Sequence, residues 1–550
     1  MIHYVCKYTP IELFAGFGET AELYNPLLES LETADGLTHR NMCSFSRALL
    51  AARMLDVTDL LVLTDCCDSI RRAWDVLQAS GQQIQMIALP HQQQECSRAL
   101  YKNELLRLLA EWEEWTGKKF NSVLFRAAFT EHEGDISGPY VALLGARLGD
   151  DVLAAIREQS PLPLRNLTCT GLRQLDMPPE SDDIDMLMEW YAAELLMQPA
   201  CMRMSDLSSR RALTEDPNLR GIIYNTVNFC DFYGFEYADL LHKADVPMVK
   251  IETDYTPQGS AQLRTRLGAF YEELKVSPQT SFSHRSQKGK AYYAGIDSGS
   301  TTTNAVLIDQ EKNIVASCSL LTGVQIAESA RQALQMVLQK SGLSGGQIRA
   351  TVSTGYGRSG IAFRDRDVTE ITCHAKGAHH LNSHVRTVID IGGQDSKIII
   401  LNQDGSVRDF MMNDKCAAGT GRFLELMAQT LGLTIDEMAS YGLKAREKIT
   451  ISSMCSVFAQ SEVVSLIAAG KRVEDIVHGL DCSVAARVTA LAGRKKLERE
   501  WMMTGGVANN PGVVAAIAER LGGQVLVPVE PEICGALGAA LIALEESVRS

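Results

Sequence analysis

A strand–turn–strand pattern that occurs twice in the second half of this sequence constrains the fold more than any other feature. The copies, "GIDSGSTTTNAVLID" and "IDIGGQDSKIIILN", lie about 90 residues apart. In each copy a hydrophobic run ends at an acidic residue, a glycine-containing polar turn follows, and a second hydrophobic run begins. Aligning Asp297 with Asp390 also aligns Asn304 with Lys397. Two such units predict two similar subdomains that face each other across a cleft.

The turns of both copies are suited to binding phosphate. Glycine lets a backbone approach a phosphate closely, and inward-facing amides form an anion-binding nest. The phosphate-binding candidates are Gly299, Ser300, Thr301, Thr302, Gly392 and Gly393. A third glycine turn, "MMTGGVANNPGV", precedes a predicted helix and is expected to bind the nucleoside or its ribose through Gly505, Gly506 and Asn509. A single turn of this kind is usually an ordinary hairpin, but an aligned pair with a third turn is far more specific.

The acidic residues of these turns need a separate explanation, because carboxylates repel phosphate. We expect Asp297, Asp390 and Asp395 to hold Mg²⁺ or to orient an attacking water. Gln394 lies in the same turn and completes the catalytic candidates. The arrangement resembles the actin, sugar-kinase and Hsp70-type ATPase fold, and that resemblance implies ATP as the ligand.

Two cysteines precede predicted amphipathic helices in this half. Cys416 in "NDKCAAGTGRFLELMAQTLG" and Cys455 in "ISSMCSVFAQSEVVSLIAAG" each lie near a helix start, where free N–H groups and the helix dipole favour a thiolate. A lone cysteine is usually a small buried hydrophobic residue, but two in matching contexts favour ligation. Because a [4Fe–4S] cluster usually takes four cysteines, a symmetric dimer would supply the other two.

Residues 291–550 resemble the ATP-dependent activators of 2-hydroxyacyl-CoA dehydratases and the benzoyl-CoA reductase ATPase subunits. The motifs "STGYGR", "EITCHAKGA", "DIGGQDSK", "NDKCAAGTGRFLE" and "SMCSVFAQSEVVSL" occur in order. The resemblance implies an anaerobic homodimer with one bridging [4Fe–4S] cluster on Cys416 and Cys455. It also implies that ATP drives low-potential electron transfer and that a ferredoxin or flavodoxin re-reduces the cluster. Asn304 stands where many members have lysine, which leaves Lys397 as the candidate cationic phosphate contact.

The first half alternates apolar runs such as "DLLVLTDCCD" and "IQMIALP" with helical stretches, which predicts an α/β domain with a mainly parallel sheet. Functional residues in such folds collect where strands end in loops. Neighbouring cysteines are rarely both packing residues, since adjacent strand residues face opposite sides. The predicted cluster ligands are Cys43, Cys67 and Cys230, followed by Cys66 and Cys96. Cys169 is a weaker candidate, and Cys6 and Cys201 are expected to be structural.

This half resembles the cluster-bearing subunits of 2-hydroxyacyl-CoA dehydratases and the double-cubane cluster proteins, on stretches such as "YTPIELFAGFGE", "CCDSIRR" and "FCDFYGFEYADLL". The resemblance implies three cysteines for one [4Fe–4S] cluster, matching Cys43, Cys67 and Cys230. A fused double cubane would need more, for which Cys66, Cys96 and Cys169 are available. The segment is shorter than a complete dehydratase subunit, so relay, docking and catalysis are all open for this half.

A polar stretch, "SPQTSFSHRSQKGK", separates the two halves. The chain of 550 residues exceeds the ~250–300 residues at which single cores stop growing. We therefore predict a dehydratase-subunit-like domain at 1–277, a linker at 278–290 and an ATPase domain at 291–550.

Charge and hydropathy argue against other classes. The net charge of −14 disfavours a general nucleic-acid-binding surface. Apolar runs fall short of the ~20 residues that span a bilayer, and the N-terminus has neither the basic nor the apolar region of a signal peptide. We expect a cytoplasmic protein without membrane partners, in which the fourteen cysteines are reduced.

The sequence thus predicts an ATPase that drives electrons from a bridging cluster to an iron–sulfur acceptor. That acceptor lies in its own N-terminal half or in a separate dehydratase or reductase. Two alternatives stay open. One is a small-molecule kinase of the same ATPase fold, in which Cys416 and Cys455 would be incidental. The other is a non-catalytic regulatory protein that senses nucleotide.

Overall fold

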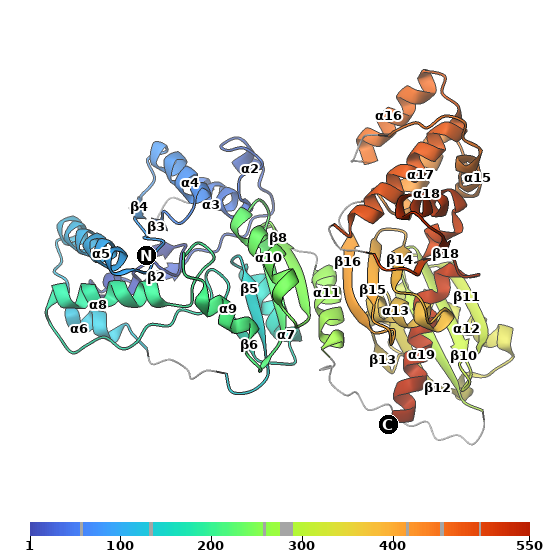
Figure 1. Ribbon diagram of the computed structural model, residues 1–550, viewed down its shortest axis with the longest axis horizontal. Helices are drawn as coiled ribbons and strands as arrows, with labels where there is room; N and C mark the ends of the chain where they lie inside the picture. The colour runs from blue at the N-terminus through green and yellow to red at the C-terminus, as the bar shows by residue number, and fades with distance from the viewer. Residues whose placement is uncertain are drawn as a thin grey trace. The chain divides into compact units, whose positions relative to one another are not determined.

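A computed structural model describes residues 1–55, 59–130, 136–256, 260–274, 290–413, 417–451, 456–493 and 497–549. They form two compact units, Met1–Phe270 and Tyr271–Ser550 (Figure 1). The predicted linker at 278–290 lies outside the described residues, except for Lys290. Among the described helices, none combines the length and the apolar character that crossing a membrane requires.

The N-terminal unit contains two four-stranded sheets in which all strand pairs are parallel. The first has the order β2-β1-β3-β4 and the second the order β6-β5-β7-β8. The strands are β1 (Ile2–Tyr4), β2 (Ala21–Leu23), β3 (Leu60–Thr64), β4 (Ile84–Ile87), β5 (Tyr140–Gly145), β6 (Leu164–Asn166), β7 (Leu219–Val227) and β8 (Met248–Thr253). Parallel strands need helical crossovers, and the sequence provides them. The predicted parallel α/β fold is confirmed.

The helices of this unit follow the strands along the chain. They are α1 (Ile11–Ala15), α2 (Glu32–Asp35), α3 (Ser44–Leu55), α4 (Asp68–Ala79), α5 (Glu95–Thr116), α6 (Ser122–Ala127), α7 (Asp150–Gln159), α8 (Ile184–Met197), α9 (Ser208–Thr214), α10 (Asp231–Lys243) and most of α11 (Ser260–Glu273), which ends in the C-terminal unit. The helix predicted from "NELLRLLAEWEEWTG" is the last part of α5, and Gly117 ends it in the left-handed conformation that glycine adopts readily.

The C-terminal unit contains two five-stranded sheets with the same order, β11-β10-β9-β12-β13 and β16-β15-β14-β17-β18. In each sheet the first two pairings are antiparallel and the last two are parallel. The strands are β9 (Tyr292–Ser298), β10 (Thr302–Ile308), β11 (Ile314–Leu321), β12 (Ile348–Thr354), β13 (Arg366–Asp367), β14 (Thr387–Ile391), β15 (Ser396–Leu401), β16 (Val407–Asn413), β17 (Trp501–Thr504) and β18 (Val525–Leu526). The duplication predicted from the repeat is therefore confirmed, as is the expected duplicated ATPase fold.

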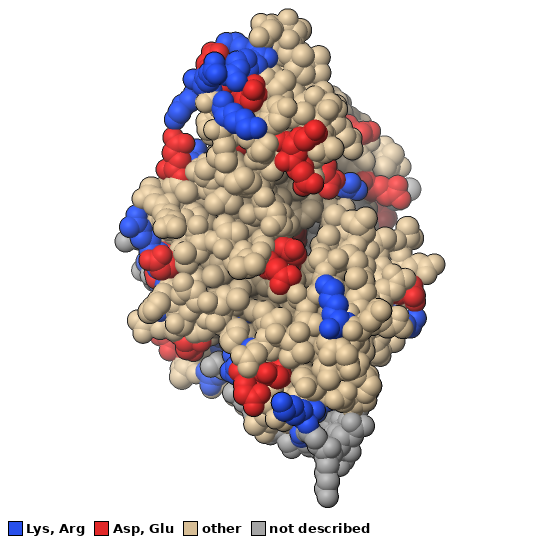
Figure 2. All heavy atoms as spheres, turned by 90° about the vertical axis from the view of Figure 1, so that its right-hand side faces the viewer, with Lys and Arg blue, Asp and Glu red and all other residues tan. Residues whose placement is uncertain are grey.

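The helices of the C-terminal unit are α12 (Ile326–Ser341), α13 (Glu370–Leu381), α14 (Gly421–Leu431), α15 (Ile435–Tyr441), α16 (Ser456–Ala468), α17 (Val473–Ala490), α18 (Pro511–Leu521) and α19 (Cys534–Arg549). Lys and Arg side chains on the face shown in Figure 2 are interspersed with Asp and Glu and separated by wide uncharged areas. Across the described part of that face, the basic side chains do not form the continuous surface that nucleic-acid backbones attract.

Glycines let α13 and α19 pack at very short range. A methyl group added at Gly538 would lie 1.8 Å from the Cys373 carbonyl oxygen, and one added at Gly377 would lie 2.1 Å from the Cys534 carbonyl oxygen. Each helix therefore presents a glycine to the backbone of the other. This close packing fixes the position of α13, which carries part of the site described below.

The substitution Gly538→Ala tests this packing. The new methyl group meets backbone rather than a flexible side chain, so the helices must separate. We expect overpacking to lower the unfolding free energy by about 1–3 kcal/mol and to lower the melting temperature. Gly345→Ala is the matched control, because its methyl group would meet only Leu338 Cδ1 at 4.0 Å. Equal melting temperatures for the two variants would contradict the close approach.

Candidate functional site

The aspartate-containing turns of the two repeats have the same backbone geometry. The Gly299 amide donates to the Thr302 carbonyl at 2.9 Å, and the Gly392 amide donates to the Asp395 carbonyl at 3.0 Å. Asp297 lies near the end of β9, and Asp390 occupies the corresponding place in β14. Each turn therefore presents its glycine directly beyond an acidic strand end.

The turns also lie against one another. A methyl group added at Gly393 would lie 2.0 Å from Thr301 Oγ1, so the second turn packs on the first. The third glycine turn joins them, because a methyl group added at Gly505 would lie 2.9 Å from Asp390 Oδ1. Gly505 has a φ of +82°, which glycine adopts without strain. The structure thus brings all three predicted turns to one place.

The remaining predicted nucleotide contacts occupy the edge of this region. Ser300 and Gln394 are exposed, and Thr301 and Thr302 are partly buried. Gly506 and Asn509 begin and end a short 3-10 helix, η4 (Gly506–Asn509), and Asn509 Nδ2 donates to Glu532 Oε2 at 3.3 Å. Their nucleotide-binding roles stay predictions.

The strand register reproduces the alignment of the repeats. Asn304 pairs with Asp297 across β9 and β10, and Lys397 pairs with Asp390 across β14 and β15. The two positions differ in charge but not in burial, since Asn304 is 5% exposed and Lys397 is 3% exposed. The buried Oδ1 of Asn304 has no hydrogen-bond partner among the described residues.

A histidine that the sequence analysis did not select connects the two repeats. His374 on α13 is buried, with Nε2 3.7 Å from Asp297 Oδ2 and Nδ1 3.4 Å from Asp390 Oδ1. Burial would lower the pKa of His374, but Asp390 and Asp297 raise it well above its usual value. Thr504 completes the contact by donating to Asp390 Oδ1 at 2.9 Å. An imidazolium at this point compensates two buried carboxylates at once.

Lys397 lies among three carboxylates. Its Nζ is 2.7 Å from Asp395 Oδ2, 3.3 Å from Asp390 Oδ2 and 3.6 Å from Glu370 Oε1. Burial would lower the pKa of Lys397, but these three groups raise it well above its usual value. The amine therefore compensates the acidic turn in the structure, and a direct phosphate contact by Lys397 stays a prediction.

Both cations, His374 and Lys397, act on the pKa of Asp390. Burial would raise the pKa of its carboxyl group, but His374 and Lys397 hold that pKa below its usual value. Glu370 differs, because burial raises its pKa despite Lys397. Glu370 and His374 are one turn apart on α13, so the motif "EITCHAKGA" already placed them on one helix face. That spacing was the signal that could have selected both residues.

The second glycine turn is joined directly to the helix that follows Cys416. The amides of Gly421 and Arg422, the first two residues of α14, donate to the carbonyls of Gly392 and Gly393 at 2.9 and 2.8 Å. Since a helix start has free N–H groups, the turn serves as the cap of α14. Any shift of the turn must therefore move the start of α14.

α14 in turn packs against α16, the helix that follows Cys455. Gln460 Nε2 on α16 donates to Thr430 Oγ1 on α14 at 3.1 Å. Cys416 and Cys455 themselves lie outside the described residues. Their helices begin where the sequence placed them and lie in contact, but the ligand roles of the two cysteines stay predictions.

Each of the three cysteines predicted to ligate a cluster in the N-terminal unit, Cys43, Cys67 and Cys230, precedes a helix. Cys43 comes directly before α3, and Cys67 and Cys230 are the N-cap residues of α4 and α10. Free N–H groups and helix dipoles at helix starts favour negative charge on nearby sulfurs. Hydrogen bonds with Cys66 and Cys43, together with burial, nevertheless raise the pKa of Cys67 and Cys230. The local sequence explains the positions, because each cysteine occupies the polar turn between an apolar strand or loop and an amphipathic helix.

Side-chain contacts link these thiols. A hydrogen bond from Cys230 lowers the pKa of the Cys43 thiol, and Cys67 acts on Cys43 through its charge. Cys66 hydrogen-bonds to both Cys67 and Cys6, and the contact with Cys6 raises the pKa of Cys66 to about 12. The structure thus brings Cys43, Cys66, Cys67 and Cys230 into one region of the unit.

The other cysteines of this half divide into two groups. Cys6 and Cys201 are buried and Cys169 is partly buried, and their charges act on the same region. Cys96 is exposed on α5, and no described residue links it to these thiols by a hydrogen bond. Its predicted ligand role stays a prediction without geometric support.

The donor chemistry of the region suits an iron–sulfur cluster, because cysteine sulfurs are the usual ligands of such clusters. Within the described ranges, no group of three or more His, Cys, Asp or Glu side chains is arranged to hold a metal ion. The fit to a cluster therefore rests on the nature of the donors and on their helix-start positions.

Both units of the chain are similar to known proteins. The sequence profile of the BadF/BadG/BcrA/BcrD ATPase family matches residues 294–543. The 2-hydroxyisocaproyl-CoA dehydratase activator of Clostridioides difficile is 41% identical over 259 residues, which make up 47% of this chain and 97% of that protein. The chain belongs to the BadF/BadG/BcrA/BcrD ATPase family. Its C-terminal unit is an ATPase domain of that family.

Further relatives agree. The activator of lactoyl-CoA dehydratase of Anaerotignum propionicum is 47% identical over 46% of this chain and 98% of that protein. Among solved structures, component A of the Acidaminococcus fermentans (R)-2-hydroxyglutaryl-CoA dehydratase is 40% identical, with 47% of this chain and 99% of that chain covered and a TM-score of 0.46. The profile of the 2-hydroxyglutaryl-CoA dehydratase D-component matches residues 6–134 and 141–274. Both family resemblances expected from the sequence are confirmed.

The substitution His374→Gln tests the charge compensation in this family's ATPase domain. It leaves Asp297 and Asp390 without the cation between them, so we expect the unfolding free energy to fall by about 3–5 kcal/mol. The folded state holds the His374 proton more tightly than the unfolded state does. The stabilisation that charged His374 contributes is therefore complete below the pKa of histidine in the unfolded chain, about 6.5. It is lost as pH rises through the pKa of His374 in the folded protein.

Urea unfolding of the wild type and His374→Gln between pH 6 and pH 10 measures this dependence. The difference between the two proteins should shrink as pH rises. His384→Gln is the matched control, because His384 is exposed at the end of the same α13 region. A difference that stays constant over the whole range would show that His374 acts by packing rather than by charge.

Proposed function

We propose that this protein uses ATP hydrolysis to drive a low-potential electron from a [4Fe–4S] cluster on the C-terminal unit to an iron–sulfur acceptor. One observation carries the proposal. The amides at the start of α14 are bonded to the Gly392–Gly393 turn, which is the predicted phosphate contact. A turn that moves with the nucleotide state would therefore move the helix that follows Cys416.

The nucleotide would lie between the two repeats. Backbone N–H groups of the turns at Gly299 and Gly392 would donate hydrogen bonds to its phosphates. Asp297, Asp390 and Asp395 supply the carboxylate oxygens that Mg²⁺ prefers, or they would position the attacking water. His374 and Lys397 lie within ion-pair distance of these carboxylates and so hold the carboxylate side chains in place.

Cys416 and Cys455 would be the ligands from one copy of the chain, with the same pair from a second copy completing a bridging cluster. The exposed apolar surface of α16 is an argument for binding of a second copy of the chain. Its side chains Phe458, Val464 and Ile467 are 69%, 53% and 42% exposed. Apolar residues distributed around an exposed helix are explained when another protein surface covers them. α16 lies at the end of the C-terminal unit away from the C-terminus (Figure 1).

The electron acceptor would be a cluster in the N-terminal unit or in a separate dehydratase or reductase. Cysteines at three helix starts support Cys43, Cys67 and Cys230 as ligands of a [4Fe–4S] cluster or of part of a double cubane, with Cys66 beside them. An iron–sulfur cluster bound there would supply one-electron chemistry. A ferredoxin or flavodoxin would re-reduce the C-terminal cluster. The names of the relatives, activators of 2-hydroxyacyl-CoA dehydratases, support an acceptor of that class.

The double substitution Cys416→Ser and Cys455→Ser tests the electron-donating site. In anaerobically purified protein it should remove the iron bound by the C-terminal unit, abolish that cluster's EPR signal and stop ATP-dependent electron transfer. ATP binding should persist, because the glycine turns are unchanged. Cys482→Ser on α17 is the matched control and should keep iron, signal and transfer. A double variant with wild-type iron content and full electron transfer would refute the assignment.

A further inference from the structure

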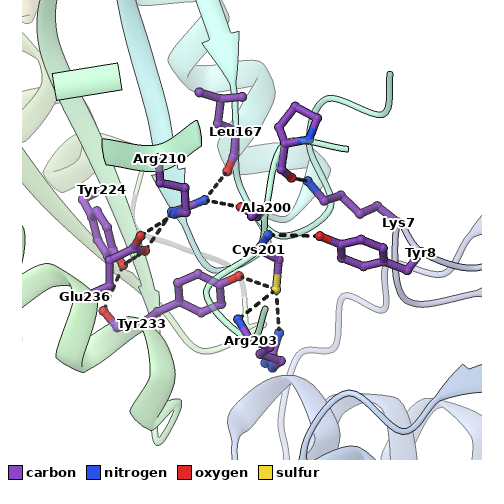
Figure 3. Close-up of polar contacts among 11 residues, drawn as sticks. Lys7, Tyr8, Leu167, Ala200, Cys201, Arg203, Arg210, Tyr224, Tyr233 and Glu236 are labelled. Carbon is purple, nitrogen blue, oxygen red and sulfur yellow. Dashed lines mark hydrogen bonds and ion pairs between the residues drawn. The ribbon is translucent and has the colours of Figure 1, made fainter. Parts of the chain in front are cut away.

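A loop between α8 and α9 places an arginine beside the cysteines of the N-terminal unit. The Arg203 amide donates to Cys201 Sγ at 3.4 Å, and Arg203 Nη1 lies 4.0 Å from the same sulfur (Figure 3). The hydroxyl of Tyr233 donates to that sulfur at 3.5 Å. Cys201 thus holds the backbone and the side chain of Arg203 at the same point.

The loop itself is held from both sides. The Cys201 amide donates to Tyr8 Oη at 3.2 Å, and Arg210 Nη1 donates to the Ala200 carbonyl at 3.1 Å. Arg210 is fixed in turn by a bidentate ion pair with Glu236 (Figure 3). These loop contacts hold Arg203 in place without an ion pair of its own.

Arg203 lacks the carboxylate partner that Arg210 has. In the part of the chain that the structure describes, no Asp or Glu lies within ion-pair distance of its guanidinium, and the buried Nε finds no acceptor. Its guanidinium carbon lies 5.3 Å from the ring centre of Phe232 and 5.5 Å from that of Tyr233. These rings follow Cys230 on α10. A guanidinium placed in protein surroundings without a carboxylate costs free energy, and a nearby anion would offset that cost.

The groups around Arg203 that can supply negative charge are thiols. Burial would lower the pKa of the Arg203 guanidinium, but Cys66, Cys67 and Cys201 raise it well above its usual value. The same guanidinium also acts on Cys169 and Cys230. Because the rings of Phe232 and Tyr233 in the first turn of α10 lie against this guanidinium, the cation is placed beside the helix start at Cys230.

We propose that Arg203 is the fixed positive charge that stabilises the reduced state of the iron–sulfur acceptor held by the N-terminal thiols. The inference rests on the proposed function in one respect, namely that Cys43, Cys67 and Cys230 ligate a cluster. Reduction adds one electron and no proton, so the bound group becomes more negative by one charge. A nearby guanidinium favours that change, because net charge and hydrogen bonding set the potential of such groups. Arg203 acts as a positioning and charge-setting residue and is not itself a ligand.

The test is a redox titration followed by EPR. It uses the full-length, iron-loaded protein carrying Cys416→Ser and Cys455→Ser, so that only the N-terminal signal remains. Arg203→Gln should make reduction at least tenfold less favourable, a shift of about 59 mV to more negative potential for one electron. Arg203→Lys should restore most of the wild-type value, since it keeps the charge. Arg220→Gln, which removes an exposed cation of the same unit, should leave the potential unchanged, because solvent and salt screen that charge.

Each further outcome decides the proposal. An iron-loaded Arg203→Gln protein with the potential of Arg220→Gln would overturn it. If Arg203→Gln fails to bind iron while Arg203→Lys binds it, the positive charge is required and the proposal is supported. If both variants lose iron, Arg203 serves the loop and the proposal is overturned. Failure of the proposed function would give a different result. The protein with intact Arg203 would then contain no iron that depends on Cys43, Cys67 and Cys230.

Discussion

A buried row of alternating charges holds the two repeats of the ATPase unit together. Asp297, His374, Asp390 and Lys397 alternate in sign, and each is at most 7% exposed. Opposite charges attract strongly at low local dielectric, whereas a single unpaired charge there would be costly. The acidic strand ends that face the predicted phosphates are therefore stable only because α13 and β15 supply cations. The close glycine packing of α13 on α19 keeps one of those cations in place.

The coupling from this charged site to the cysteine helices uses backbone hydrogen bonds. The Gly392–Gly393 turn lies directly after the Asp390 strand, and its carbonyls cap α14. α14 packs on α16, so the two helices that follow the predicted ligands Cys416 and Cys455 are connected to one turn. A backbone connection of this kind transmits small movements, because packed helices shift as units. The turn that we propose to contact the phosphates thus also holds the start of α14.

Much of this architecture follows from local sequence patterns. The repeat around Asp297 and Asp390 predicted two similar subdomains, and the two sheets have the same strand order. The alignment of Asn304 with Lys397 also corresponds to the register, since each is the cross-strand partner of its own aspartate. Helix starts after cysteines were predictable, since a polar turn before an amphipathic run marks a helix N-terminus. His374 and Arg203 were not predicted, because their roles depend on contacts with residues far away in the chain. The motif "EITCHAKGA" places Glu370 and His374 on one helix face, but it does not show which residues that face contacts. A loop arginine such as Arg203 has no periodic pattern at all.

The two units thus contain complementary arrangements, buried carboxylates compensated by cations in one and thiols facing a guanidinium in the other. The central claim is that nucleotide hydrolysis at the first drives an electron out of the C-terminal cluster. The most direct measurement mixes reduced, iron-loaded protein anaerobically with an oxidised dehydratase-type acceptor and follows cluster oxidation over time. The account predicts rapid oxidation with Mg·ATP and little with a non-hydrolysable analogue or without nucleotide. Oxidation at the same rate without nucleotide would contradict it.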